Sequence, residues 1–384
     1  MNNITNKTIA IVGGGPGGLT LARLLQLHGA NVKVFERDIN KDARAQGATL
    51  DLHEESGLKA LEAAGLMGEF WANYRPGADK LCIVDKNTNL FFDDADNEEG
   101  ERQRPEIDRG PLQNILLNSL HPGTVVWDSR FVSMTQSNNV WKLDFKNGTS
   151  AYADLVIAAD GGNSKVRPYI TGIKPFYVGI TAVEGAVYNS VTACPKIHKL
   201  LNGGKIFAMD DEKTLIVSSK GDGSLVFYTS CKTEENWVKT CGINFADKAQ
   251  VTEWFKDEYF WWDDIWLELF ENAAPNFIPR PQYCMPLDQT WDALPNLTML
   301  GDAAHLMPPY AGEGVNMAML DALELSQCLT NTTFTTMQQA IEAYEQQMRI
   351  RAGEAAEQTL VSTEALHSNE AVSFFLQILE GGND

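Results

Sequence analysis

The chain has 384 residues, of which 44% are hydrophobic and 21% are charged, and its formal net charge is −20. This composition is that of a soluble globular protein, and the length predicts at least two domains. The negative field repels phosphate backbones and anionic lipid, so we expect no nucleic-acid or membrane partner, and the charge suits a monomer.

The lack of a recognisable targeting segment and the arrangement of the cysteines predict a cytoplasmic protein. No apolar run approaches the roughly 18 residues that a membrane-spanning helix needs. The first residues, MNNITNKT, lack the basic and apolar segments of a signal peptide, and the six cysteines are scattered without a Cys-x-x-Cys pair. We therefore expect a cytoplasmic protein with reduced thiols, no disulfide framework and no metal site.

A glycine-rich run near the N-terminus predicts a dinucleotide site. The predicted strand 8–12 runs directly into GGGPGG, which fits G-x-G-x-x-G at Gly13, Gly15 and Gly18. A helix pattern, a second predicted strand at 31–35 and Glu36 follow at the expected spacing. The pyrophosphate would lie at the helix N-terminus, and Glu36 would hold the adenosine ribose.

Two arginines flank the next loop. Arg37 follows Glu36, and Arg44 precedes the run GATLDLH at 47–53. Two interpretations stay open: solvated surface arginines, or cations beside the phosphates and the edge of a cofactor.

The following segment contains a second candidate ligand contact. Residues 56–72 are expected to form a helix, and residues 76–104 a hairpin with an acidic, solvated loop. A further helix pattern begins near Leu112, with Arg109 at its start, where a positive charge opposes the helix dipole. That local cost indicates another task for Arg109, such as binding a ligand.

A buried strand predicted at 154–159 ends in the turn DGGNSKVR. This turn is either an ordinary loop, or it places the carboxylate of Asp160 and the free N–H groups that start at Gly161 beside a cofactor.

From about residue 172 the pattern changes to closely spaced strands, which predict a second domain built on an antiparallel sheet. The predicted strands lie at 181–188, 205–209, 214–219 and 224–231. An aromatic-rich helix is expected over 246–272 and should pack against this sheet.

The stretch 297–329 predicts a second contact with a flat ligand. A buried strand at 297–300 breaks at Gly301-Asp302, passes Pro308-Pro309 and reaches Gly312-Glu313-Gly314 before a long apolar helix. Glycines at a helix N-terminus let a planar, electron-rich group approach bare N–H groups, as a flavin ring requires. Residues 337–379 are predicted to be helical.

Three signatures therefore stand in order: GGGPGG at 13–18, DGGNSKVR at 160–167 and GDAAHLMPPYAGEGVN at 301–316. With them the chain resembles the single-component (group A) flavoprotein aromatic hydroxylases, which share the fold of p-hydroxybenzoate hydroxylase. It looks most similar to the tetracycline-inactivating flavin monooxygenases, through GATLDLH and through PEIDR, ILLNSL and YEQQM at 105–109, 115–120 and 344–348.

The resemblance implies an α/β fold with a Rossmann-like FAD-binding domain of the GR2 type and an inserted antiparallel-sheet substrate domain. The expected FAD-binding domain comprises residues 1–72, 102–171 and 283–330. The expected substrate domain comprises 73–101 and 172–282. C-terminal helices at 331–384 would include one that bridges the domains.

Together with the glycine motif, the resemblance predicts the cofactor contacts. Arg44 would help receive NADPH, or NADH, as a transient co-substrate. Flavin and O2 would carry the chemistry, so we expect no catalytic side chain, and His53 and His305 should pack or cap. The expected FAD contacts are Gly13, Gly15, Gly18, Glu36, Arg37, Asp51, Arg109, Asp160, Gly161, Asp302, Gly312, Glu313, Gly314, Val315 and Asn316.

The substrate contacts depart from the family pattern. The resemblance implies that tetracycline-inactivating relatives bind their polyketide substrate through Gln, Arg and His side chains on the middle sheet. A rough alignment of the similar sequence segments puts Glu184, Lys205 and Val226 near these positions. Glu184 and Lys205 are either surface charges or a pair that reads the ligand, and Pro309 is a further candidate contact. Glu313 stands where the closest relatives carry Gln.

The implied function is FAD-dependent monooxygenation that uses NAD(P)H and O2 to hydroxylate a polycyclic aromatic or polyketide substrate, such as a tetracycline-type antibiotic. One alternative is hydroxylation of another phenolic or polyketide metabolite. Others are a flavin reductase, a flavoprotein that only sequesters a ligand, and a flavin-dependent halogenase, whose W-x-W-x-I-P run is absent here.

Overall fold

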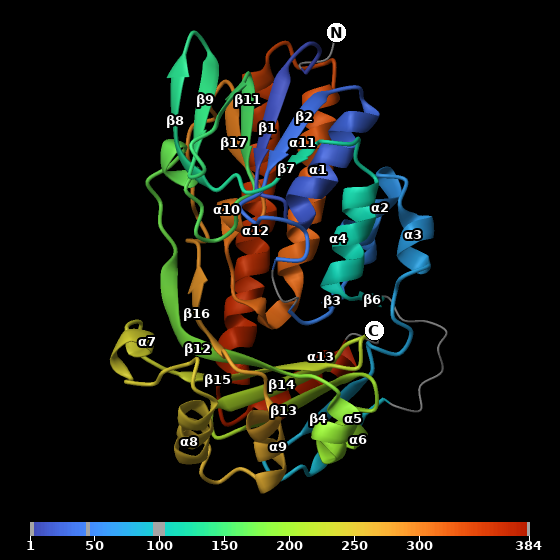
Figure 1. Cartoon of the computed structure of the whole chain (residues 1–384), viewed down its shortest axis with the longest axis vertical. Coiled ribbons are helices and arrows are strands. Elements are labelled where there is room, and N and C mark those ends of the chain that lie inside the picture. The colour runs from blue at the N-terminus through green and yellow to red at the C-terminus, as the bar shows by residue number, and fades with distance from the viewer. Residues whose placement is uncertain (1–3, 44–46, 95–103, 382–384) are drawn as a thin grey trace.

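The computed structural model describes residues 4–43, 47–94 and 104–381. Figure 1 shows two halves, with a parallel sheet and its helices at one end and a large curved sheet at the other. A mixed α/β architecture with a Rossmann-like half is confirmed. The limits of the predicted domains stay a prediction.

The first half is built on a five-stranded parallel sheet in the order β17-β11-β1-β2-β7. Helices α1 (Pro16–Leu27) and α11 (Glu313–Thr330) pack on one another beside it. The central strands β1 and β11 are nearly continuous apolar runs, as in a sheet covered on both faces, whereas β2 alternates buried residues with exposed Asn31 and Lys33. The strands are β1 (Thr8–Val12), β2 (Asn31–Phe35), β7 (Val125–Val126), β11 (Leu155–Ala158) and β17 (Leu297–Met299).

Shorter elements complete this half. A three-stranded meander and the small pair of β3 (Leu50–Asp51) with β6 (Glu106–Ile107) flank the sheet. The helix predicted at 56–72 is wrong as one element, because Gly65 adopts φ +71° and separates two short helices. The elements are β8 (Phe131–Ser137), β9 (Val140–Phe145), β10 (Ser150–Ala153), a π-turn (Glu54–Leu58), α2 (Lys59–Ala63), α3 (Met67–Trp71) and α4 (Arg109–Asn118).

The second half is a seven-stranded sheet in the order β16-β12-β15-β14-β13-β4-β5. The four strands predicted between residues 181 and 231 pair antiparallel, as expected, whereas β4 joins β13 in parallel. The β4–β5 hairpin lies between α3 and β6 in the chain, so this segment leaves the first half, joins the second sheet and returns. The strands are β4 (Leu81–Val84), β5 (Leu90–Asp93), β12 (Phe176–Val187), β13 (Lys205–Asp210), β14 (Lys213–Ser219), β15 (Leu225–Lys232) and β16 (Ile278–Cys284).

One face of this sheet carries an aromatic core, as the sequence predicts. Phe227 on β15 packs against Phe270, which stacks on Phe255 with ring centroids 3.9 Å apart. The single helix predicted at 246–272 is wrong, because the chain turns after Glu258 and the Asp263 side chain accepts from a backbone N–H to start a new helical turn. The helices here are α5 (Ser190–Ala193), α6 (Pro195–Leu201), α7 (Trp237–Thr240), α8 (Lys248–Glu258) and α9 (Leu267–Asn272).

The C-terminal helices connect the two halves. Helix α12 (Met337–Leu366), about 45 Å long at 1.5 Å per residue, packs against α11 and reaches the second sheet (Figure 1). Helix α13 (Ala371–Gly381) then lies on the sheet face opposite the aromatic core, where Phe375 contacts Phe207 with centroids 5.0 Å apart. Within the described ranges, no helix combines the length and apolarity that a membrane crossing requires.

Candidate functional site

The carboxyl ends of four parallel strands converge on one region. Gly13 follows β1, Glu36 follows β2, and Asp160 and Gly301 lie two residues beyond β11 and β17. Ligands of open α/β sheets bind at this edge. The three sequence signatures therefore meet in space at the place where such a fold binds a ligand.

The glycine-rich turn is shaped by close backbone approach. Gly13 has φ +113°, and a Cβ atom there would lie 2.1 Å from the carbonyl oxygen of Ala159. A Cβ on Gly18 would lie 2.2 Å from the Gly13 carbonyl oxygen, whereas nothing lies within 4 Å of one on Gly15. Gly15 caps α1 without a side-chain hydrogen bond, so the first N–H groups of this helix are open to an anion.

Glu36 supports this turn from β2. Its carboxylate is buried and accepts a hydrogen bond of 2.7 Å from the Gly14 N–H and one of 3.0 Å from the Asp38 N–H. The neighbouring side chain of Arg37 is exposed. Arg44, the predicted NADPH contact, lies outside the described residues.

Arg167 links the second signature to the third, a role that the sequence analysis missed although the residue lies within DGGNSKVR. Its buried guanidinium donates to the carbonyl oxygens of Ala303 at 2.6 Å, Asp302 at 2.9 Å and Gly162 at 3.0 Å. Asp160 accepts from the Lys165 N–H at 2.7 Å, which closes the turn. Gly161 adopts φ +82°, a conformation that glycine accommodates readily.

Asp302 begins α10 (Asp302–His305). Its side chain is accessible to solvent, yet desolvation by the surrounding protein raises its pKa against the opposing charges of His305, Arg109 and Arg167. A carboxylate that is accessible to solvent and is also surrounded by protein atoms is suited to accept hydrogen bonds from ligand hydroxyls.

His305 contributes to this turn from the interior, in agreement with the structural role expected for it. The His305 Nε2 atom lies 2.6 Å from Asp321 Oδ2, which also accepts from the Gly301 N–H at 2.8 Å. Both side chains are buried. The pair therefore holds the backbone that carries Asp302.

The N-terminus of α11 forms the opposite wall. Gly312 is left-handed at φ +73°, and a Cβ there would lie 3.1 Å from Asp51 Oδ2. Glu313 starts the helix, no side chain caps it, and space is open beside Gly314, so together with half-buried Val315 this turn could admit a flat ring. The amide of Asn316 is used within the protein, donating to the Asp51 carbonyl at 2.9 Å and accepting from the His53 N–H at 2.9 Å.

His53 is buried and lies beside three carboxylates, one of which, on exposed Glu55, is 3.8 Å from its Nδ1 atom. Its Nε2 atom is 3.1 Å from Asp51 Oδ2, and its Nδ1 atom is 3.7 Å from Glu313 Oε1. Burial acts to raise the pKa of Asp51, but the hydrogen bond from His53 and the charge of Lys205 outweigh it and hold that pKa below its ordinary value. Desolvation raises the pKa of Glu313, and the charge of His53 opposes that shift.

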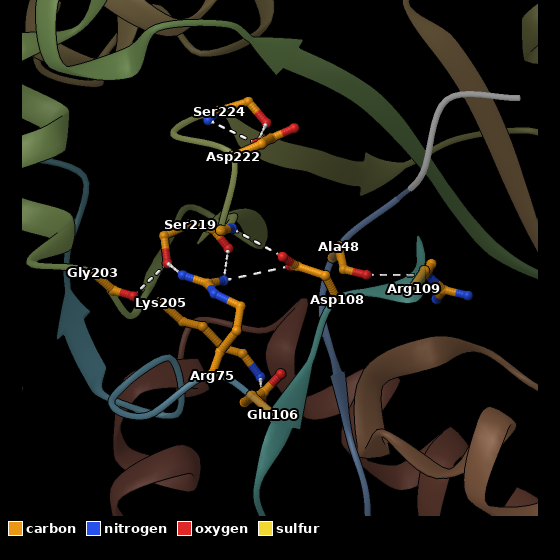
Figure 2. Close-up of polar contacts among 11 residues, drawn as sticks. Ala48, Arg75, Glu106, Asp108, Arg109, Gly203, Lys205, Ser219, Asp222 and Ser224 are labelled. Atoms are coloured by element: carbon orange, nitrogen blue, oxygen red, sulfur yellow. Dashed lines mark hydrogen bonds and ion pairs between the residues drawn. The ribbon is translucent and has the colours of Figure 1, made fainter. Parts of the chain in front are cut away.

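Polar contacts join the two halves beside this wall (Figure 2). Lys205 on β13 forms an ion pair with Glu106 on β6, whose side chain is only 1% exposed. Arg75 donates to the Ser219 carbonyl at 2.7 Å and lies 3.6 Å from Asp108. The ammonium of Lys205 is thus engaged across the junction, and its partner Glu106 was missed by the sequence analysis although it lies in the quoted run PEIDR.

The face of the second sheet that looks toward the first half carries the remaining candidates. Glu184 on β12 lies opposite Tyr228 on β15, and its carboxylate accepts from Arg280 Nε at 2.5 Å. The Tyr228 hydroxyl accepts from the Ala48 N–H at 3.3 Å, and Arg109 Nε donates to the Ala48 carbonyl at 3.1 Å (Figure 2 shows the latter contact).

The two other predicted substrate contacts differ from one another. Val226 lies on the same strand as Tyr228, two residues before it, and is 2% exposed. Pro309 is exposed at the start of a short turn whose next residue, Tyr310, donates to Ser230 Oγ at 3.0 Å. Tyr228, Tyr310 and Arg280 had no sequence motif that could have identified them.

These residues fit FAD. The open N-terminus of α1 suits a pyrophosphate, Glu36 stands at the ribose end, and Asp302 and the glycine-lined start of α11 suit a polyol chain and a planar ring. Across the described part of the chain, no cluster of three His, Cys, Asp or Glu side chains has the geometry of a metal site.

Comparison with known proteins agrees with this geometry. The profile of a family described as FAD binding domain matches residues 6–260 and 291–359. Monooxygenase penA of Penicillium thymicola is 27% identical, covering 94% of this chain and 95% of its own.

Solved structures show the same fold. The crystal structure of an FAD containing monooxygenase from Photorhabdus luminescens superposes with a TM-score of 0.77 and 25% identity, over 94% of this chain and 98% of that one. Tetracycline destructase Tet(51) superposes with a TM-score of 0.72 and 18% identity, over 94% and 91%.

Proposed function

The chain belongs to the FAD binding domain family of flavin-dependent monooxygenases, and from this premise we propose that it uses NAD(P)H and O2 to hydroxylate a polycyclic aromatic or polyketide substrate of the tetracycline type. Bound FAD supplies the redox and oxygen-transfer chemistry. The side chains of this protein bind, orient and shield the reacting groups.

The observation that carries the proposal is a group of polar side chains on β12 and β15, on the sheet face that looks toward the FAD half. Tyr228 and Glu184 lie on this face, and the Tyr228 hydroxyl contacts Ala48 in the loop that Arg109 also contacts. A substrate on this face would lie between the second sheet and the start of α11. Aromatic and charged groups there suit a flat molecule with several oxygen atoms.

Reduction by a nicotinamide cofactor without its own domain is part of the proposal. The chain contains one G-x-G-x-x-G run that follows a strand, and Glu36 and the α1 N-terminus are the groups for FAD in that unit. NADPH or NADH would then dock transiently against the exposed side of the FAD site. Arg44 is the proposed contact for it.

The test is NADPH and NADH oxidation by the FAD-loaded protein with and without tetracycline, together with product mass. A substrate-stimulated rate with a gain of one oxygen atom from labelled O2 is the expected result. Stimulated oxidation without labelled oxygen in the product would indicate a reductase or uncoupled turnover. Binding of tetracycline without any nicotinamide oxidation would indicate a sequestering flavoprotein, and both results would refute the proposed reaction.

A further inference from the structure

The ion pair of Glu184 and Arg280 lies on the sheet face that looks toward the FAD half. In register, Glu184 is opposite Tyr228, and Arg280 on the edge strand β16 is opposite Ala182. Residues opposite one another in a sheet share a face, and residues two apart on a strand do as well. Glu184, Arg280 and Tyr228 therefore share one face, whereas Val183 points into the aromatic core behind it.

The two members of the pair are unequally accessible. The Glu184 side chain is 12% exposed and the Arg280 side chain is 48% exposed. Glu184 uses Oε2 to accept from Arg280 Nε at 2.5 Å. Among the described residues the Arg280 side chain has no hydrogen-bond or ion-pair partner other than Glu184, so the terminal Nη1/Nη2 edge of the guanidinium is available.

Tyr228, on the same face as this guanidinium, contacts the FAD half. Its hydroxyl lies 3.3 Å from the Ala48 nitrogen, and a Cβ on Gly47 would lie 3.2 Å from that hydroxyl. Desolvation and the charge of Glu184 raise the pKa of Tyr228, and the charges of Arg109 and Arg280 act against that rise. The phenol therefore stays protonated and lies within the fields of both guanidinium groups.

Because the protein is strongly acidic overall, an exposed arginine on this face indicates a site for an anionic ligand. At a formal net charge of −20, the protein as a whole repels an anionic ligand. A local arginine can retain an anionic ligand against this field through charge-assisted hydrogen bonds, and the fork of its guanidinium matches a carboxylate at two points.

We propose that Arg280 selects the substrate, binding through its Nη1/Nη2 edge a carboxylate or an ionised enol carried on the aromatic or polyketide framework. Glu184 is a positioning residue, because its bond to Nε fixes the plane of the guanidinium. This inference rests on the proposed function, since it names the chemical class of substrate at the same site.

The experiment measures dissociation constants of the FAD-loaded protein by calorimetry with two matched probes, 1-hydroxy-2-naphthoate and 1-hydroxy-2-naphthamide. The wild type should bind the acid at least tenfold more tightly than the amide. Arg280→Gln should remove that preference by weakening the acid only. Arg280→Lys should restore it in part, because charge is kept and the fork is lost.

Two further variants separate recognition from general effects. Glu184→Gln keeps an oxygen acceptor for Nε and removes a negative charge, so the acid should bind severalfold more tightly and the amide unchanged. Arg130→Gln removes an exposed arginine on the other half and should alter neither constant. FAD content and thermal unfolding of each variant check that it is folded.

The inference is overturned if the amide binds as tightly as the acid, if neither probe binds at millimolar concentration, or if Arg280→Gln leaves the preference intact. These equilibrium constants do not depend on turnover. An Arg280-dependent preference in a protein that transfers no oxygen would support the inference and refute the proposed reaction. Oxygenation of a substrate with no effect of Arg280→Gln would do the reverse.

Discussion

Acidification from pH 7 to pH 5 should destabilise the protein through His367, at the turn between α12 and α13. The ring is fully buried, with Nε2 2.8 Å from Ser230 Oγ and Nδ1 2.8 Å from the Thr363 carbonyl oxygen. Burial lowers the pKa of His367 to about 4, although the hydrogen bond to Thr363 acts in the opposite direction. The imidazole is therefore neutral in the folded protein at neutral pH.

The sign and size of the effect follow from proton linkage. In the unfolded chain a histidine has a pKa of about 6.5, so between pH 6.5 and pH 4 the unfolded state binds more protons. This contribution to stability is present above pH 6.5 and is lost as the pH falls. For pKa values of 6.5 and about 4, the free energy of unfolding should fall by about 2 kcal/mol between pH 7 and pH 5.

The assay is urea unfolding followed by tryptophan fluorescence at both pH values, for the wild type and for His367→Gln. The variant loses stability at pH 7, but its additional loss at pH 5 should be smaller than that of the wild type by about 2 kcal/mol. His28→Gln, a substitution at an exposed histidine, sets the baseline. An equal pH dependence in the wild type and His367→Gln would refute the argument.

Three substitutions test the site. Gly13→Ala should abolish FAD retention and cost at least about 1–3 kcal/mol of unfolding free energy, because its Cβ would lie 2.1 Å from the Ala159 carbonyl oxygen; retained FAD would contradict this. Asp302→Ala should weaken FAD retention, measured by visible absorbance, and a fully yellow, active variant would refute the assignment. Lys205→Met should cost about 3–5 kcal/mol in urea unfolding, because it leaves Glu106 buried without its partner; the double variant with Glu106→Gln should recover part of the loss, and no recovery would argue against the pair.

Gly148 provides the matched control for the glycine substitution. It has φ +84°, and nothing lies within 4 Å of the position of its Cβ. Gly148→Ala therefore introduces backbone strain without a clash and should retain FAD. Loss of FAD in this variant would show that strain alone explains the effect at Gly13.

Several features of the site could be predicted from the sequence because they depend on local backbone geometry. A strand that runs into G-x-G-x-x-G and a helix produces the open N-terminus of α1, and the next strand brings Glu36 to the glycine turn at 2.7 Å. Short separations leave few alternatives for what these residues can contact. The structural role predicted for His305 also fits the structure, but its buried partner Asp321, 16 residues further along the chain, was not predicted.

The breaks in the predicted helices and the direction of β4 were not predicted. The apolar residues keep helical spacing through 56–72 and 246–272, but the chain turns at Gly65 and after Glu258 and ends a helix at each place. The parallel pairing of β13 with β4 depends on how an excursion from one half joins the edge of a sheet in the other. Periodicity carries no information on the direction in which a strand enters a sheet.

The sequence by itself determined the fold class, the family and the strand ends at which a cofactor site forms, because apolar periodicity and glycine spacing specify strands, helices and turns one after another. Only the tertiary structure decided the partners of the charged residues. Lys205 meets Glu106 across 99 residues, and Glu184 meets Arg280 across 96. These pairs depend on strand register and on the docking of one half against the other, and a buried carboxylate or an accessible guanidinium acquires its chemical role only when that docking sets its surroundings.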